Sequence, residues 1–210
     1  LENGSIEIIG VSKLSGGEIE VIPDRIEAGT YIIAGVMNGD KLKIKHLIPE
    51  HIKALTDKLY EMGANIEIGD DYVIASKAEK LKPVEVTTEA YPGFPTDLQQ
   101  PITALLTMCD GVSIVREKIY ENRFQNVPYL SHMGADIKIS GDSLTINGPT
   151  KFKANEVITT DLRAGACLLL AALSADGETL IKEVKYVLRG YENIINKLTK
   201  IGVEIALEHE

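Results

Sequence analysis

The chain has 210 residues, of which 44% are hydrophobic and 25% are charged, and its net charge is −9. This length and composition are typical of one large or two small globular domains. The negative charge argues against a general nucleic-acid binder, and the longest apolar run, residues 164–173, is too short to span a bilayer. We therefore expect no nucleic-acid partner and no membrane partner.

The cysteines and histidines predict neither a disulfide nor a metal site. Cys109 and Cys167 each lie within an apolar stretch, as core thiols do, and the histidines lack zinc-ligand spacing. Unpaired thiols, together with a first stretch that does not look like a secretory signal, favour a reducing, cytoplasmic location.

Helix-like and strand-like segments alternate along the chain. The first group is a strand at residues 18–22, a helix over 25–37, a strand over 41–46, a helix over 49–62, and strands near 65–69 and 71–76. The second group is a strand at 84–88, a helix over 96–109, a strand over 111–117, a helix near 127–133, and strands at 136 and 144. The third group is a strand at 156–160, a helix over 161–174, a strand over 179–182, a helix over 190–200 and a strand over 204–207.

Two motifs recur in each of these groups and predict an internal triplication. A glycine that ends a helix-like segment precedes an alternating strand, as a left-handed C-cap does. These glycines are Gly63, Gly134 and Gly202. An aspartate precedes an apolar helix, where a carboxylate can cap the helix N-terminus. These aspartates are Asp24, Asp97 and Asp161. We expect one domain, residues 1–210, made of three repeats over about 17–80, 84–150 and 155–208.

The first helix of each repeat predicts how the layers are arranged. It is apolar over much of its circumference, most clearly at residues 163–173, and such helices are buried on most sides. Several strands alternate between apolar and polar residues, as in a sheet with one solvated face. We predict an α/β fold, an inside-out barrel of three βαβαββ repeats with helices inside and three sheets outside. Residues 164–173 should be among the most buried.

Asp97 differs from the other two aspartates in its local charges. Arg25 follows Asp24 and Arg163 follows Asp161, whereas no arginine lies within the next several residues after Asp97. Because a nearby cation lowers the basicity of a carboxylate, we expect Asp97 to be the freest to accept a proton, besides any capping. A structural role is favoured for Asp24 and Arg25, since capping explains the aspartate.

The chain has only five arginines, and three of them lie at equivalent edges of the repeats. Arg163 is expected in the first turn of a helix, and Arg189 directly before the start of another at Gly190. The dipole disfavours a cation at both places, so a functional role is favoured. Arg123 follows Glu121 closely and could form a surface ion pair. Taken together, these three arginines predict a site for an anion at one end of the domain.

Six short motifs along the chain carry a family resemblance. In chain order they read IPDRIEAGT, FPTDLQQ, YENRF, HMGAD, TDLRAGA and RGYENI. Together they resemble the UDP-N-acetylglucosamine 1-carboxyvinyltransferases, the enolpyruvyl transferases of peptidoglycan synthesis. The resemblance implies two similar domains, each of three βαβαββ units, with the active site between them. This chain looks like the C-terminal domain, without the N-terminal partner that carries a phosphoenolpyruvate-binding Lys-Asn pair and a general-acid cysteine.

The resemblance also implies an activity and roles for single residues. The family transfers the enolpyruvyl group of phosphoenolpyruvate to the 3-hydroxyl of UDP-N-acetylglucosamine, releases phosphate, and needs no metal or other cofactor. Asp97 resembles the aspartate that contacts the hydroxyl and takes its proton, and Asp161 resembles a second cleft aspartate in proton handling. Contacts to the sugar nucleotide are implied for Ile119 and Tyr120. A place on the phosphoenolpyruvate side is implied for Arg123, Arg163 and Arg189.

Two alternatives to this function stay open. A non-catalytic module that binds an anion or a sugar nucleotide needs the same arginines. The shikimate-pathway enolpyruvyl transferase is a lesser alternative, because the motifs around Asp97 and Arg123 match the peptidoglycan enzyme better. The chain by itself is expected to show no turnover, since one wall of a two-domain cleft is missing.

Overall fold

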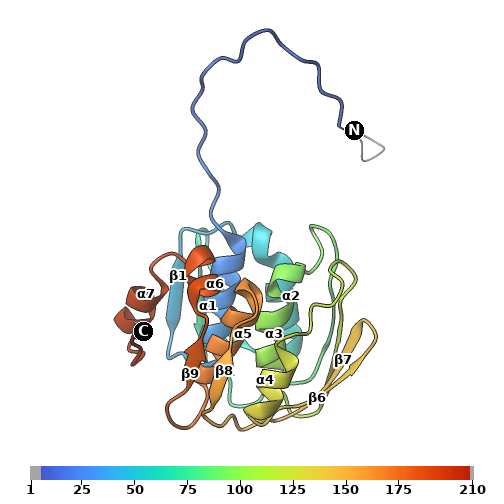
Figure 1. Ribbon diagram of the computed structural model, residues 1–210, viewed down its shortest axis with the longest axis vertical. Helices are drawn as coiled ribbons and strands as arrows, with labels where there is room; N and C mark the ends of the chain where they lie inside the picture. The colour runs from blue at the N-terminus through green and yellow to red at the C-terminus, as the bar shows by residue number, and fades with distance from the viewer. Residues whose placement is uncertain (1–5, 209–210) are drawn as a thin grey trace.

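The computed structural model describes residues 6–208 and consists of an α/β body from which a long arm extends (Figure 1). Three helices, α1 (Arg25–Asn38), α3 (Gln99–Leu106) and α5 (Leu162–Leu173), pack against one another in the middle of the body. The sheets and the remaining helices lie around these three. The prediction of an α/β fold with helices inside and sheets outside is confirmed.

The described residues form three separate sheets. In the first, β3 (Tyr72–Ser76) lies between β1 (Leu42–Lys45) and β2 (Asn65–Ile68), antiparallel to both. The second has the order β4 (Glu85–Thr87), β5 (Val112–Arg116), β7 (Ser143–Asn147), β6 (Asp136–Ser140), and only the β4–β5 pair is parallel. The third pairs β8 (Glu156–Ile158) in parallel with β9 (Leu180–Lys182). Within residues 6–208 the sheets are open and do not join into a closed barrel. The predicted division into three repeats stays a prediction, although each of the three ranges holds one sheet.

The core lies where the three central helices meet. Along α5, the side chains of Ala164, Ala166, Cys167 and Leu168 are fully buried. Small residues at the start of α5 allow neighbouring elements to approach closely: a Cβ added at Gly165 would lie 2.3 Å from Cγ2 of Val187. The prediction that this segment is among the most buried is confirmed. No helix of the described chain is long and apolar enough to cross a membrane.

Two of the three recurring aspartates cap helices. Oδ1 of Asp24 accepts from two backbone N–H groups of α1, at 2.7 and 3.1 Å. Oδ1 of Asp161 does the same for α5, at 2.8 and 2.9 Å. Asp97 lies in a short 3₁₀ helix, η2 (Thr96–Leu98), that leads into α3, and its side chain makes no capping hydrogen bond. The predicted helix over 96–109 is thus a 3₁₀ turn followed by α3, and a similar turn, η1 (Pro49–Ile52), precedes α2 (Lys53–Met62).

The strand predicted at residues 18–22 is absent, because that segment has no neighbouring strand. Residues 6–24, which we call the arm, run extended away from the body (Figure 1). A strand needs a partner for its backbone N–H and C=O groups, and the arm pairs with none in the described structure. Its aliphatic side chains are 64–90% exposed. They are Ile6, Ile8, Ile9, Val11, Leu14, Ile19, Val21 and Ile22.

The end of the chain also differs from the prediction. The helix expected over 190–200 is two helices, α6 (Lys185–Gly190) and α7 (Ile194–Lys200). Tyr191 interrupts them in extended conformation, with its side chain buried and its hydroxyl 2.9 Å from Oγ1 of Thr30, and Asn193 follows at φ 49°. The strand predicted over 204–207 is wrong, since these residues pair with no sheet. The remaining helix, α4 (Val127–His132), is close to its prediction.

Candidate active site

Asp97 is held between two arginines that come from distant parts of the chain. Its Oδ1 accepts a hydrogen bond from Arg123 at 2.7 Å, and its Oδ2 accepts one from Arg163 at 3.1 Å. The two arginine side chains are 11% and 16% exposed, and the aspartate is 40% exposed. The carboxylate therefore lies at the surface with the two cations packed behind it. We call these three residues the Asp97 cluster.

This geometry overturns the expectation that Asp97 is free of ion pairs. That expectation counted only the arginines that follow Asp97 closely in the sequence, and tertiary folding brings two others to it. Partial burial alone would raise the pKa of Asp97, but the Arg163 and Arg123 guanidiniums outweigh it and hold the pKa below its usual value. In this arrangement Asp97 is a stable anion and a weak base.

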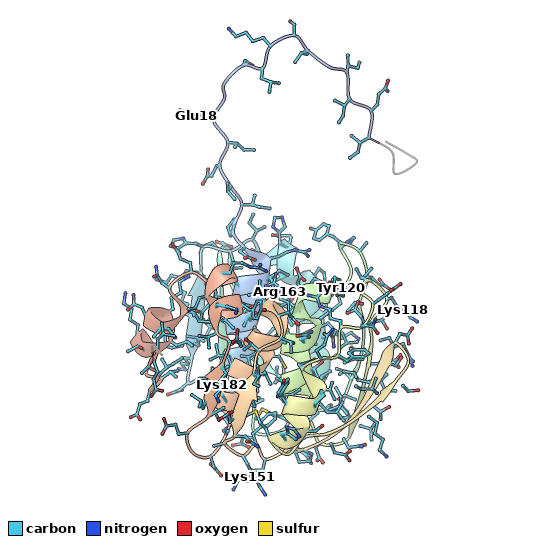
Figure 2. The ribbon with its side chains drawn as sticks, viewed as in Figure 1. Glu18, Lys118, Tyr120, Lys151, Arg163 and Lys182 are labelled. Carbon is cyan, nitrogen blue, oxygen red and sulfur yellow. The ribbon has the colours of Figure 1, made fainter. Side chains whose placement is uncertain are left out.

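Arg163 is fixed by the first turn of α5 and by a buried tyrosine. It is the second residue of that helix, as predicted, and its own backbone N–H is one of the two that Asp161 caps. Its side chain also hydrogen-bonds the Tyr191 hydroxyl, which in turn contacts Thr30 of α1. Figure 2 shows Arg163 toward the end of the body from which the arm emerges. The unfavourable position of this cation at a helix N-terminus is offset by its pairing with Asp97.

Arg123 is partly buried and pairs with Asp97 rather than at the surface with Glu121. One of its guanidinium nitrogens donates to Oγ1 of Thr96 at 3.2 Å, in addition to the contact with Asp97. Nε2 of Gln100 donates to its backbone carbonyl at 2.9 Å, which ties the segment to α3. The guanidinium also lies 4.7 Å from the centroid of the Tyr120 ring, within the range of a cation–π contact.

An open hollow of about 650 Å³ adjoins Arg123. The residues that line it are 117–125, Ile139, Gly141 and Asp142. Ile119 and Tyr120 are 50% and 59% exposed here, so a ligand can reach an aliphatic and an aromatic side chain next to the Asp97 cluster. Lys118 and Asp142 form an ion pair among the lining residues. A concave surface with apolar side chains and a few charged groups is typical of a binding site for a polar small molecule.

Arg189 does not lie where the sequence predicted. It belongs to the last turn of α6 instead of preceding the start of a helix, and it is exposed. A cation is favourable at a helix C-terminus, so the argument from an unfavourable dipole no longer supports a functional role for it. The described structure shows Arg189 in no ion pair, and it does not join the Asp97 cluster.

Glu117 is a site residue that the sequence reasoning missed. Its carboxylate is buried between Thr96 and the loop that carries Ile119 and Tyr120, and it accepts hydrogen bonds from both sides. The pattern that could have revealed it is the two-residue period of β5, in which Ser113 and Val115 are buried. Continued by one step, that period places Glu117 on the buried face.

The cysteines lie in the core, and neither is a candidate for acid catalysis. Both are unpaired and fully buried. Burial raises the pKa of Cys109 to about 11 and that of Cys167 to about 12. In the part of the chain that the structure describes, no three His, Cys, Asp or Glu side chains come together to hold a metal ion.

Relatives of known name match almost the whole chain. It is 46% identical to UDP-N-acetylglucosamine 1-carboxyvinyltransferase 2 of Listeria monocytogenes, over 96% of this chain and 48% of that protein. It is 48% identical to the proteins of the same name from Geobacillus kaustophilus and Bacillus subtilis, over 95% of this chain and 47% of each. The chain thus spans about half the length of the curated relatives it matches. The resemblance inferred from the six motifs is confirmed.

Solved structures and a family model agree with these relatives. The enolpyruvyl transferase NikO from Streptomyces tendae, 32% identical, superposes with a TM-score of 0.83 over 89% of this chain and 44% of that one. EPSP synthase from Acinetobacter baumannii shares the fold, with a TM-score of 0.71 at 20% identity, over 96% of this chain and 50% of that one. The family model described as EPSP synthase (3-phosphoshikimate 1-carboxyvinyltransferase) matches residues 2–198. Because this match covers nearly all of the sequence, the chain belongs to the EPSP synthase (3-phosphoshikimate 1-carboxyvinyltransferase) family.

Proposed function

We propose that the chain is one half of an enzyme that transfers the enolpyruvyl group of phosphoenolpyruvate to the 3-hydroxyl of UDP-N-acetylglucosamine. Phosphate is the second product, and the reaction is the first committed step of peptidoglycan synthesis. The observation that carries this proposal is the Asp97 cluster beside the hollow that Ile119 and Tyr120 line. The names of the relatives at 46–48% identity support the choice of substrates.

The arginines of the cluster suit the anionic substrate. Phosphoenolpyruvate carries a phosphate and a carboxylate, and the planar guanidinium fork binds such groups through paired hydrogen bonds. Arg123 and Arg163 each donate a hydrogen bond to Asp97. An arriving phosphate or carboxylate competes for the same donors. As the aspartate loses its partners, its pKa rises, and it becomes a better base.

This exchange of partners gives Asp97 its role in the reaction. Asp97 takes the proton of the sugar 3-hydroxyl, and the hydroxyl oxygen forms a bond to C2 of phosphoenolpyruvate while a proton is added to C3. Loss of a proton from C3 then re-forms the double bond as the C2–O bond to phosphate breaks. The acid that protonates C3 belongs to the other half of the enzyme, because Cys109 and Cys167 are buried in the core.

In this proposal Ile119 and Tyr120 contact the sugar nucleotide. The roles of Asp161 and Arg189 have less direct support. Oδ1 of Asp161 is engaged in capping α5, while Oδ2 has only a 3.4 Å contact from Thr160, so proton handling falls to that second oxygen. The place of Arg189 on the phosphoenolpyruvate side rests on the resemblance of its motif alone.

The partner in this proposal is the other half of the enzyme. The relatives are about twice as long as the matched region, and the exposed aliphatic side chains of the arm are a surface for another protein segment to cover. With one wall of the cleft absent, the chain alone gives no turnover. The unpaired thiols of Cys109 and Cys167 agree with the cytoplasmic location that belongs to the proposal.

The test is a chimera in which this chain replaces the matching half of the Bacillus subtilis relative. Phosphate release from phosphoenolpyruvate is measured with UDP-N-acetylglucosamine as acceptor, for the chimera and for the chain alone. We expect phosphate from the chimera only. A folded chimera that binds the sugar nucleotide but releases no phosphate supports the non-catalytic binding module. Release with shikimate 3-phosphate, and none with the sugar nucleotide, supports the shikimate-pathway activity.

A further inference from the structure

Glu117 is a buried carboxylate with no cation beside it. The residue is 6% exposed, and among the described residues it takes part in no ion pair. Four hydrogen-bond donors surround it instead. A buried charge is costly unless its acceptor sites are filled, so a carboxylate kept in this place and satisfied by four neutral donors needs an explanation.

Three of the four donors lie in the loop that lines the hollow or in Thr88, which is hydrogen-bonded to that loop. Oε1 of Glu117 accepts from the backbone N–H groups of Ile119 and Tyr120, each at 2.9 Å. It also accepts from the Thr88 hydroxyl at 2.7 Å, and that hydroxyl oxygen in turn accepts from the backbone N–H of Lys118 at 2.9 Å. The start of the loop after β5 is therefore anchored to one carboxylate oxygen. The Lys118 and Tyr120 labels mark this region in Figure 2.

The fourth donor leads to the Asp97 cluster. Oε2 of Glu117 accepts from the Thr96 hydroxyl at 2.9 Å. Because the hydroxyl proton is used in this bond, the Thr96 oxygen presents its lone pairs to Arg123, which donates to it at 3.2 Å. The same guanidinium donates to Asp97. One carboxylate thus orients both the loop of the hollow and the arginine that holds the candidate base.

We propose that Glu117 is a positioning residue that couples the wall formed by Ile119 and Tyr120 to the Arg123–Asp97 pair. The inference rests on the proposed function, since it takes the hollow to be the sugar-nucleotide site. Glu117 borders the hollow, but both of its carboxylate oxygens are engaged by the four donors, so it is not a ligand-binding group. It acts through the loop backbone on one side and through the Thr96 hydroxyl on the other, so that the two binding walls keep a fixed spacing.

Three variants separate this role from a general contribution to folding. Glu117→Gln keeps the size of the side chain but removes its charge. Its amide nitrogen cannot accept, so the hydrogen bonds on one side are lost, and those on the other side are weakened because a neutral amide oxygen replaces a carboxylate oxygen. Thr96→Val removes only the connection to Arg123. Glu85→Gln is the matched control, because it makes the same charge change on the adjacent strand β4, where Glu85 is exposed and pairs with Arg116 at 2.6 Å.

The measurements are made by NMR on the ¹⁵N-labelled 210-residue chain. Amide hydrogen exchange is followed for each residue, and UDP-N-acetylglucosamine is titrated to millimolar concentration. For Glu117→Gln we expect amide exchange at Ile119 and Tyr120 to be about tenfold faster and the affinity for the sugar nucleotide to be about tenfold lower. A tenfold change is what the loss of one hydrogen bond to a charged group typically causes. Glu85→Gln should match the wild type in both. Thr96→Val should leave the two amides protected and broaden the Arg123 side-chain signals.

Each other outcome counts against a stated part of the reasoning. Unchanged exchange at Ile119 and Tyr120 in Glu117→Gln, or faster exchange spread evenly over β5 and β7, overturns the positioning role. Faster exchange at these amides with unchanged affinity overturns the connection to the ligand. A wild-type chain that does not bind the sugar nucleotide at all overturns the placement of a sugar-nucleotide site in this hollow. The exchange data still decide whether Glu117 holds the loop, and phosphate release by the chimera tests the proposed function separately.

Discussion

Replacing Asp97 with asparagine removes the counter-ion of two arginines at once. The shape of the side chain is kept, but Arg123 and Arg163, 11% and 16% exposed, lose their anion. If the ion pairs were fully buried, each charge-assisted hydrogen bond would contribute about 1.5–3 kcal/mol to the free energy of unfolding. Because Asp97 itself is 40% exposed, solvent screens the pairs, and we expect a total loss of about 2 kcal/mol. For a chain of this length the melting temperature should fall by roughly 4–8 °C.

Thermal unfolding followed by circular dichroism at pH 7 measures this loss. Asp57→Asn is the matched control, since the Lys53–Asp57 pair is exposed, at 70% and 56%, and should contribute less than about 1 kcal/mol. Added phosphate should stabilise Asp97→Asn more than the wild type, because the freed guanidiniums can bind it. If Asp97→Asn melted at the wild-type temperature and gained nothing from phosphate, the cluster would be neither a stabilising ion pair nor an anion site.

Three further predictions concern pH, packing and capping. The lowered pKa of Asp97 means that its ion pairs stabilise the fold above its ordinary pKa, about 3.9, and that this contribution is lost as the pH falls through the lower folded value. Urea unfolding should therefore show wild type and Asp97→Asn converging toward pH 2, and a constant gap would contradict the assignment. Gly165→Ala places a Cβ 2.3 Å from Cγ2 of Val187, so α6 must shift. Urea unfolding should show that the unfolding free energy falls by about 1–3 kcal/mol. An unchanged unfolding free energy would mean that α6 moves without cost. Asp24→Ala should lower the unfolding free energy by about 1 kcal/mol, whereas Asp24→Asn should not; equal effects would exclude capping as the cause.

The sequence alone determined the features that depend on neighbours within a few residues. The extents of α1 and α5 follow from apolar periodicity and from capping aspartates, and both helices begin within a residue of the prediction. The alternating strands of the first two sheets were recognised for the same reason. Burial of α5 followed from its composition, because a helix that is apolar on most sides has no stable exposed face. The six motifs were sufficient to identify the family.

Only the tertiary structure decided where charges meet and which strands find partners. Arg123 and Arg163 lie 26 and 66 positions from Asp97 in the sequence, so local spacing could not predict the pairs that make this aspartate a weak base. Residues 18–22 have the composition of a strand but no neighbour to pair with in the described structure. Tyr191, which is buried and whose hydroxyl contacts Thr30 of α1, interrupts the predicted helix. In the sequence, Glu117 looks like an ordinary polar residue at the end of a strand. Only the tertiary structure shows the four donors that surround it. Strand pairing, ion pairs and buried polar networks depend on groups that are distant along the chain, and it is the packing of α1, α3 and α5 that brings those groups together.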